Sequence, residues 1–412
     1  MKRLRNSVPV LVALALLPAI GFTQADTAKR IRHEFSVQQA VDYAKKNNVQ
    51  VKNALLDVLI QEQTNREITA AAYPQISGSL SYIDNTKLAP VVIEGGGFFG
   101  GTPGTYQKIP SFQLKNSGSA GLELNQILFD GQVFVGLQAR KAVLEFQQKN
   151  TEITEEVIKA NIYKIYYQLV VSKKQVELLD ANIERFDKLL HDTREIYKAG
   201  FAEQLDVDKV NVALTNLQTE KLKALNQIAN GYLGLKVLMG MPVQDELVLT
   251  DTLKEAEIGS AILDAGSFSY TDRKEYQYAN LGIKLNEYNI KRYKLSKIPT
   301  VSLNAYYNQI RQANSFTLSH GTSYPASAVS LRVNVPIFSG FSTNSKIQKA
   351  KLELEKSMNQ RSALELSINN EIETAKNNFN SAVASMNYQR RNMELAEKVY
   401  NQTKKKYEMG TG

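Results

Sequence analysis

The sequence predicts a mainly helical protein with β-strands, made of long antiparallel coiled-coil hairpins and four membrane strands per protomer, in two structural repeats. The first observation is a repeated motif: ILFDG at 127–131 returns as PIFSG at 336–340. The second is a shared apolar register, with steps of three and four residues, that leads from each motif to a matching tip, YKAG at 197–200 and YEMG at 407–410. Such steps are typical of coiled-coil helices. The third is a pair of alternating segments ahead of each motif, a pattern typical of strands.

Residues 1–25 have the features of a secretory signal peptide. Lys2, Arg3 and Arg5 precede an apolar run from Val8 to Ile20, which is too short to span a bilayer. Small residues near Ala25 provide a cleavage site. We therefore expect an exported protein.

The composition excludes several classes of protein. The 412 residues contain no Cys, so neither disulfides nor thiolate metal sites are available. Removal of the signal peptide leaves 47 basic against 41 acidic residues, an excess too small and too dispersed for nucleic-acid binding. Beyond the signal peptide no segment approaches the roughly 20 apolar residues of a membrane helix. If the chain spans a membrane, it must do so as strands.

The first repeat is expected to cover residues 26–240. It begins with a helix over 35–72, with Ser36 as its N-cap and Pro74 as its stop signal. Strands are expected at about 75–85 and 117–126. The glycine-rich segment between them, which includes Gly95 to Gly101, is expected to lack regular structure.

A helical hairpin over 132–238 completes this repeat. Its first helix, 132–199, contains 68 residues and is about 100 Å long at ~1.5 Å per residue. Gly200 ends that helix, since glycine tolerates left-handed backbone geometry. The return helix is expected over 203–238.

The second repeat is expected over residues 270–412, after an equatorial connector at 241–269. It contains a helix stopped at Pro299, strands at about 300–310 and 327–335, a polar loop from Arg311 to Ala326, and a long helix over 341–409. Only two residues follow Gly410. We therefore expect that the return helix is missing from a truncated C-terminus and that this form assembles poorly.

The strands predict a trimer. Each has about the ten residues that a tilted strand needs to cross a bilayer, and their polar faces carry Glu123, Arg332 and several Asn. A small soluble sheet with one wet face is the alternative. Four strands cannot close a membrane barrel, whereas three copies supply twelve, so the simplest closed solution is a trimeric α/β barrel.

No catalytic or cofactor site is indicated. His33, His191 and His320 are scattered and have no metal-ligand neighbour at helical spacing. The glycine run lacks the Lys and Ser/Thr of a phosphate-binding loop. We expect a protein that is not an enzyme and that binds no metal and no cofactor.

These features together resemble the TolC-like family of outer-membrane efflux and secretion channels. The resemblance rests on the order helix–Pro–strand–loop–strand–[ILV]-F-x-G–long helix–Y-x-x-G–return helix, in two copies. It implies a homotrimer with a twelve-stranded barrel in the outer membrane of a Gram-negative-type envelope and a helical tunnel in the periplasm. It also implies passive export of drugs, other small molecules or proteins. The expected partners are a periplasmic adaptor (membrane fusion) protein, an inner-membrane transporter and outer-membrane lipid.

The resemblance also assigns roles to particular residues. It places the periplasmic gate and the adaptor contact at the two tips: Tyr197, Gly200, Asp206, Tyr407 and Gly410. The barrel–helix turns contain Gly131 and Gly340. Where known members carry a basic residue after the second tip glycine, this chain has Gly412, and the acidic entrance ring would lie beyond it. Asp206 and Asp208 are candidates for lining the entrance, or are surface charges of the return helix.

Two other interpretations remain open at this stage. A coiled-coil structural or adhesive protein of the cell surface explains the signal peptide and the heptads, but not the alternating strands. A channel dedicated to protein secretion uses the same duct as a drug-efflux channel, so the sequence does not separate these two.

Overall fold

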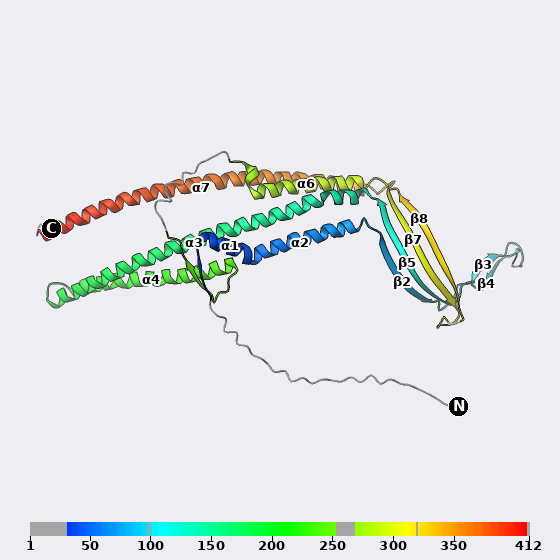
Figure 1. Ribbon diagram of the computed structural model, residues 1–412, viewed down its shortest axis with the longest axis horizontal. Helices are drawn as coiled ribbons and strands as arrows, with labels where there is room; N and C mark the ends of the chain where they lie inside the picture. Colours follow the sequence, from blue (N-terminus) through cyan, green and yellow to red (C-terminus); the bar gives the residue numbers. More distant parts are fainter. Residues whose placement is uncertain (1–30, 97, 99, 253–267, 319, 410–412) are drawn as a thin grey trace, which may run out of the picture. The chain divides into compact units, whose positions relative to one another are not determined.

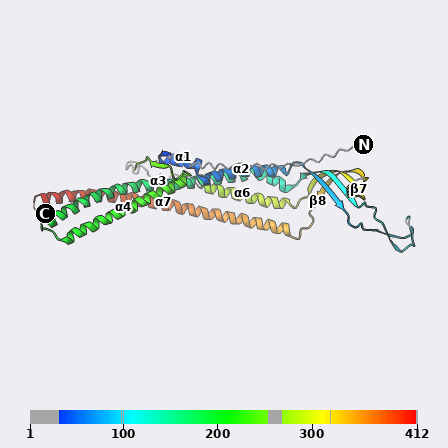
Figure 2. The same cartoon turned by 90° about the horizontal axis from the view of Figure 1, so that it is seen from below.

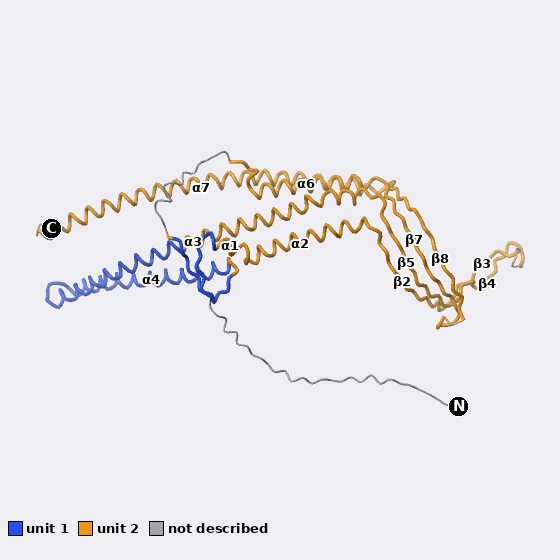
Figure 3. The backbone as a smooth tube through the Cα atoms, in the orientation of Figure 1, with its two compact units in different colours: residues 1–39, 169–237, 241–251 blue, residues 40–168, 238–240, 252–412 orange. Residues whose placement is uncertain are grey.

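The computed structural model describes residues 31–409 except for 97, 99, 253–267 and 319. The expected signal peptide and Gly410 lie outside the described residues. The chain divides into two compact units, each described by itself below (Figure 3). One comprises residues 1–39, 169–237 and 241–251, and the other residues 40–168, 238–240 and 252–412. None of the described helices combines the length and hydropathy needed to cross a membrane.

The larger unit contains a four-stranded antiparallel sheet (Figure 1). Its strands follow the order β2 (Gln75–Asp84), β5 (Asn116–Phe129), β7 (Thr300–Ala313) and β8 (Thr322–Asn334). The polar loop predicted at 311–326 is therefore too long, because β7 and β8 pair as far as Gln312 and Thr322. Within the described residues β2 and β8 each have a hydrogen-bonded neighbour on one side only, so both edges of the sheet are open.

Four helices of this unit follow the order of the strands that they adjoin (Figures 1 and 2). They are α2 (Val49–Ala70), the part of α3 (Gly131–Lys198) up to residue 168, α6 (Lys274–Leu295) and α7 (Ser342–Glu408). The contacts between neighbours are specific: Asn65 Nδ2 donates to Arg140 O at 3.0 Å between α2 and α3, and the Phe146 ring stacks on Tyr278 between α3 and α6 at 4.0 Å. Asn286 Nδ2 donates to Ser357 Oγ at 2.7 Å between α6 and α7. The helix order α2–α3–α6–α7 thus repeats the strand order β2–β5–β7–β8.

The single helix expected over 35–72 is two helices in the structure, α1 (Val37–Asn47) and α2. The interruption is Asn48, whose extended backbone (ψ 132°) lets its side chain cap α2 by accepting from the N–H groups of Gln50 and Val51. Ser36 does cap the start of α1: its Oγ accepts from Gln39 N, while Gln39 Oε1 accepts from Ser36 N. This reciprocal pair is a capping box.

The smaller unit contains a helical hairpin and a parallel two-stranded sheet. The hairpin consists of α4 (Gln204–Met239) and the C-terminal part of α3. Strand β1 (Arg32–Phe35) pairs with β6 (Glu246–Leu249), and Asp251 Oδ2 accepts from Val37 N at 2.9 Å to fasten the start of α1. The sequence gives no sign of this pairing, since four-residue strands far apart in the chain carry too little pattern.

A second hairpin corrects the expectation that the glycine-rich segment lacks regular structure. Strand β3 (Val91–Glu94) pairs antiparallel with β4 (Tyr106–Ile109). The glycines form the turn: Gly96 has φ +105°, and Gly95 N donates to Thr105 O at 2.7 Å. The glycines therefore indicate the turn of this hairpin, and strands can still form on either side of it.

Candidate functional site

One face of the four-stranded sheet is apolar. In an antiparallel sheet, residues directly opposite one another point to the same face. The register groups Ile76 with Leu124, Ala305 and Val329 in one row across all four strands. The neighbouring rows on this face contribute Val301 with Val333, Leu303 with Leu331, Leu122 with Tyr307, and Leu80. Leu80 is 88% exposed and Val329 is 75% exposed, so this face presents large apolar side chains to the outside of the protomer.

The opposite face is polar. Its rows include Ser77, Glu123 and Tyr306 in one set and Asn125, Asn304 and Ser330 in another. Side-chain hydrogen bonds run across this face, as between Ser81 Oγ and Ser119 Oγ at 2.7 Å. A sheet with these two faces suits an apolar environment on one side and water on the other.

The charges of the sheet follow the same division. The four strands contain four charged residues: Asp84, Glu123, Arg311 and Arg332. Asp84 and Arg311 belong to the apolar face but occupy its end remote from α2 and α6, where Lys115 lies 3.9 Å from Asp84. Glu123 and Arg332 belong to the polar face. Between the helices and that far end, the apolar face therefore carries no charge.

Gly131, expected at the first strand–helix turn, is the first residue of α3. Asp130 caps this helix, with Oδ1 accepting from Gln132 N at 2.7 Å. A β-carbon on Gly131 would lie 2.8 Å from Leu295 Cβ and 3.0 Å from Ile298 Cδ1. Glycine at this position therefore allows the start of α3 to approach the end of α6 closely.

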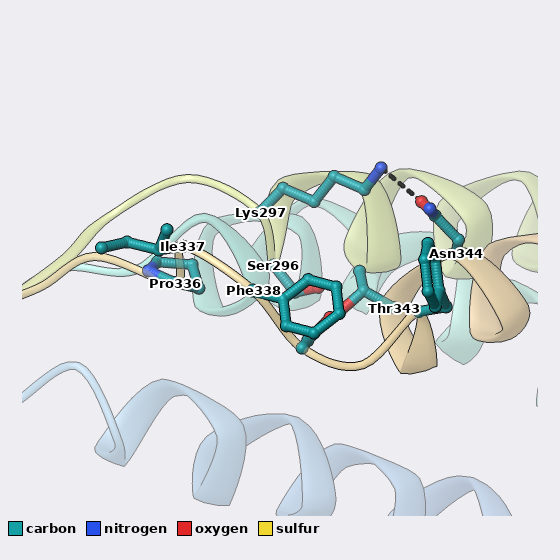
Figure 4. A pocket seen from close by; sticks show the side chains of 9 residues that line it. Ser296, Lys297, Pro336, Ile337, Phe338, Thr343 and Asn344 are labelled. Carbon is teal, nitrogen blue, oxygen red and sulfur yellow. Dashed lines mark hydrogen bonds between the residues drawn. The ribbon is translucent and has the colours of Figure 1, made fainter.

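Gly340, expected at the second strand–helix turn, has a different role. Its φ is +57°, and a β-carbon there would meet no atom within 4 Å. The turn bears exposed apolar side chains, with Ile337 94% and Phe338 76% exposed. A pocket of about 220 Å³ lies beside it, where Lys297 Nζ donates to Asn344 Oδ1 at 2.7 Å (Figure 4). In the first turn the matching aromatic, Phe129, is only 38% exposed.

The predicted tip residues Tyr197 and Gly200 lie in a tight helix-terminating turn. Gly200 has φ +83°, its N–H donates to Tyr197 O at 2.9 Å, and Phe201 N donates to Ile196 O at 3.1 Å. These two bonds define a Schellman motif, which satisfies carbonyl groups at the end of α3. Phe201 is 86% exposed at this tip.

Asp206, the third predicted tip residue, lies in the first turn of α4. Its Oδ2 accepts from Glu203 N at 3.3 Å, which supports the start of the helix, and its Oδ1 lies 3.5 Å from Lys209 Nζ. Asp208 accepts from Gln204 Nε2 at 2.8 Å. Both carboxylates are exposed on the return helix, as surface charges would be.

Behind the tip the hairpin has its own small apolar core. Leu190 of α3 packs with Val207 and Leu214 of α4, and all three side chains are buried. The partly buried residues packed against them are Ile183, Phe186 and Val210. The alternating steps of three and four in α3 thus produce the seam that holds the hairpin together.

The second predicted tip is described only in part. Tyr407 belongs to the last turn of α7, its side chain is not among those described, and Gly410 lies outside the described residues. Whether the two tips meet therefore stays a prediction. Within the described residues, no group of three or more His, Asp or Glu side chains is arranged to hold a metal ion.

The chain has relatives among characterised proteins. The model of the family described as "Outer membrane efflux protein" matches residues 40–241 and 272–412. Outer membrane protein TolC of Vibrio cholerae is 18% identical over 298 residues, covering 71% of this chain and 67% of that protein. Outer membrane efflux protein BepC of Brucella suis is 22% identical over 317 residues, covering 76% and 62%. The proteases secretion protein PrtF of Dickeya chrysanthemi is 20% identical over 200 residues, covering 48% and 43%. The chain thus spans about two thirds or less of these relatives' lengths.

Solved structures have the same fold. The outer membrane protein VceC from Vibrio cholerae superposes with a TM-score of 0.69 at 14% identity, covering 91% of this chain and 86% of that one. CusC superposes with a TM-score of 0.66 at 16% identity, covering 92% and 83%. The mainly helical architecture with a sheet, expected from the sequence, is therefore confirmed.

Proposed function

Because the chain belongs to the outer membrane efflux protein family, we propose that it forms the outer-membrane exit duct of a tripartite efflux or type I secretion system. The observation that carries this proposal is the sheet with one apolar face, one polar face and two open edges. The duct is passive and performs no catalytic step, so an inner-membrane transporter drives the cargo. BepC is named for efflux and PrtF for protease secretion, and small molecules and proteins both remain candidates for the cargo.

The two faces of the sheet fit opposite sides of a membrane wall. The apolar face, bounded by Arg311 and Asp84 at its far end, meets the lipid. The polar face, with Glu123, Asn304 and Arg332, lines a water-filled passage. The helices that continue the sheet then lie in the periplasm.

The open edges of β2 and β8 favour a closed assembly of several copies. In lipid every unpaired backbone N–H and C=O group costs several kcal/mol, so a spanning sheet cannot keep free edges. Three copies of a four-stranded sheet give the twelve-stranded barrel of a homotrimer. In this assembly β8 of one protomer pairs with β2 of the next.

The order of elements suggests the register in which β8 of one protomer pairs with β2 of the next. Apart from the β3–β4 hairpin between β2 and β5, helix, strand, strand and long helix succeed one another as α2–β2–β5–α3 and again as α6–β7–β8–α7, which supports two structural repeats. The junction between β5 and β7 then serves as the template for the junction between protomers. Aligning Pro74 with Pro299 and Phe129 with Phe338 transfers the pair Leu124–Ala305 to a new pair at the subunit junction. That new pair is Val333 with Leu80, and both of its members belong to the apolar face.

The edge helices carry apolar side chains that such neighbours would cover. On α2, Leu55 and Leu59 are about half exposed, and on α7 Leu352 and Leu366 are 65% and 72% exposed. A closed ring brings α7 of one protomer beside α2 of the next. The exposed Phe338 of the second turn would then be covered as Phe129 is partly covered in the first.

Cysteine cross-linking tests the duct and its closure. The chain contains no Cys, so Leu80→Cys and Val333→Cys can be introduced together into the full-length protein without a background thiol. Directly opposite strand residues lie close enough for a disulfide. Oxidation is expected to give covalent trimers in the outer-membrane fraction. The control pair Leu80→Cys with Val329→Cys, offset by four residues on the same face, is expected to stay uncross-linked.

The outcome also distinguishes the duct from the rival function, a coiled-coil protein of the cell surface. A soluble monomer or dimer without pore activity would contradict the duct and favour a coiled-coil protein of the cell surface. Trimers that form but cross-link through the control pair would retain the duct and reject the register.

We further propose that the tip around Tyr197, Gly200 and Asp206 is a periplasmic gate and contact site for an adaptor protein. The exposed Phe201 and the exposed charges beside it support this proposal. Tyr407 and Gly410 are proposed to form the second tip of the same gate. A Phe201→Ala variant of the full-length protein is expected to assemble normally but to bind the periplasmic adaptor at least several-fold more weakly. Unchanged adaptor binding would contradict the assignment of the tip.

A further inference from the structure

We infer that Glu123 and Arg332 set the ion selectivity of the duct, as two rings of opposite charge on its wall. This inference rests on the proposed function, in which the polar face of the sheet lines the passage. Of the four charged residues in the strands, these two alone belong to the polar face. In a trimer each of them would occur three times at one level of the passage.

The two rings lie at about the same level of the passage. Arg332 pairs with Ser302 near the start of β7, whereas Glu123 pairs with Tyr306 four residues further along the same strand, an offset of roughly 13 Å at about 3.3 Å per residue. Because barrel strands are tilted, this offset does not separate the charges along the axis of the passage. In a trimer closed through Val333 and Leu80, each Arg332 lies two strands from a Glu123 on either side, offset by four residues in opposite directions, so the two rings interleave at one level.

The surroundings of both rings are uncharged. The neighbouring positions on the polar face are uncharged, and Asn125 Nδ2 donates to Glu123 Oε1 at 3.2 Å. Both charged side chains are exposed in the protomer. On the polar face of the described strands, Glu123 and Arg332 are therefore the two charged residues that act on ions in the passage.

Screening decides whether the rings cancel or act separately. The Debye length is about 8 Å at 0.15 M salt and about 30 Å at 0.01 M. At physiological ionic strength an Arg332 and the nearest Glu123, offset by roughly 13 Å along the strand and two strands apart, are separated by more than the Debye length, so each attracts counter-ions locally. Charges that line a cleft give potentials on the order of several kT. The strand wall of the passage is thus expected to make two opposed contributions to ion selectivity.

The test is the reversal potential of single pores of the full-length protein in a KCl gradient. Arg332→Gln is expected to shift the ratio of K⁺ to Cl⁻ permeability toward K⁺ by about twofold or more, since one kT changes a local ion concentration by a factor of about 2.7. Glu123→Gln is expected to shift it toward Cl⁻ by a similar factor. The double variant is expected to return close to the unsubstituted protein.

The controls use the charges of the other face. Arg311 and Asp84 belong to the apolar face, so Arg311→Gln and Asp84→Asn are expected to leave the ratio of K⁺ to Cl⁻ permeability unchanged. Arg332→Cys adds a test on the assembled pore: an anionic methanethiosulfonate reagent should increase K⁺ selectivity, and a cationic one should restore Cl⁻ permeability.

The outcomes distinguish this inference from the function beneath it. Conducting trimers in which Arg332→Gln and Glu123→Gln shift selectivity in the same direction, or not at all, would overturn the inference and retain the duct. A shift with Arg311→Gln as large as that with Arg332→Gln would also overturn it. Trimers that never conduct would overturn the proposed function and the inference together.

Discussion

Gly131 lies directly against Leu295, such that a β-carbon at position 131 would be 2.8 Å from Leu295 Cβ and 3.1 Å from its carbonyl oxygen. Gly340, at the matching strand–helix turn, has open space around it and a φ of +57°. Two glycines in the same motif are therefore required for different reasons. The first permits close packing of two helices, and the second permits a left-handed backbone.

Substitutions distinguish these two requirements. Gly131→Asn should prevent the approach of α3 to α6, because the added β-carbon would clash with the Cβ and the carbonyl oxygen of Leu295. It should destabilise the protein by about 1–3 kcal/mol. Gly340→Asn should cost less, because Asn tolerates left-handed geometry and nothing obstructs its side chain. Thermal unfolding of the purified protein measures both. Equal losses at the two positions would contradict this assignment.

The Schellman turn at the hairpin tip gives a second prediction. Gly200→Ala places a β-carbon on a residue with φ +83° and should cost about 1–2 kcal/mol, with Gly200→Asn intermediate. Gly234, inside α4 with no atom near its missing β-carbon, is the matched control. Gly234→Ala should stabilise by about 0.5–1 kcal/mol, because Ala favours the helix. Hydrogen exchange around 196–204 measures the first effect locally, and a stabilising Gly200→Ala would refute it.

The sequence predicts much of this fold because long periodic segments carry strong signals. The steps of three and four in α3 correspond to the seam formed by Leu190, Val207 and Leu214. The alternation in β5 and β7 correctly separates an apolar from a polar face. Both patterns arise from burial and persist over many residues, so chance variation does not hide them.

Features that depend on distant partners are not visible in the sequence. Asn48 interrupts an otherwise continuous helical pattern, and the same side chain that caps α2 also donates to Leu238 O, 190 positions away. The difference between Gly131 and Gly340 likewise depends on whether α6 lies beside the turn. Such roles follow from tertiary packing, which local patterns do not encode.

Asn48 accordingly gives a third prediction. Its Nδ2 donates to Leu238 O at 2.6 Å while its Oδ1 accepts from two N–H groups of α2, and the residue is 6% exposed. Asn48→Ala removes both functions and should cost about 1–3 kcal/mol. Asn48→Asp retains the cap but places a carboxylate oxygen, which cannot donate, against the Leu238 carbonyl oxygen. This variant should therefore not regain the stability of the unsubstituted protein. Full rescue by Asp would show that only the cap matters.

A pH dependence follows from the ion cluster between α3 and α6. Glu152 Oε2 lies 2.7 Å from Lys149 Nζ and 2.8 Å from Lys274 Nζ. Desolvation tends to raise the pKa of Glu152, but its hydrogen bonds with Lys149 and Lys274 outweigh this and hold the pKa below the ordinary value. The hydrogen bond to Glu152 raises the pKa of Lys274.

The lowered pKa of Glu152 determines the pH range in which its carboxylate stabilises the fold. This stabilisation is fully present above the ordinary Glu pKa of about 4.3 and is lost as the pH falls through the lower pKa of the folded state. The Lys274 contribution persists until the pH rises above about 10.4. Glu152→Gln should therefore lower the melting temperature at pH 7, with the difference shrinking as the pH falls through the lowered pKa of Glu152. Glu177→Gln, which breaks an exposed pair with Lys174 inside α3, should have little effect over the same pH range.

The apolar core behind the tip gives the last prediction, which concerns gating. Leu190 is 4% exposed and packs between α3 and α4, whereas the adjacent Leu189 is 46% exposed. Leu190→Ala should weaken the hairpin by about 2–5 kcal/mol, and Leu189→Ala by about 0.5 kcal/mol or less. Hydrogen exchange over 183–214 should accelerate in the first variant alone.

If the proposed gate opens by separating α3 from α4, the same substitution favours the open state. If the closed form is destabilised by about 2 kcal/mol and the open form is not, the ratio of open to closed pores rises by a factor of about 30. Bilayer recordings of the full-length protein should then show a higher open probability for Leu190→Ala than for Leu189→Ala. Accelerated exchange with an unchanged open probability would mean that the tip opens as a rigid hairpin, because the packing of Leu190 against Val207 would then survive the transition.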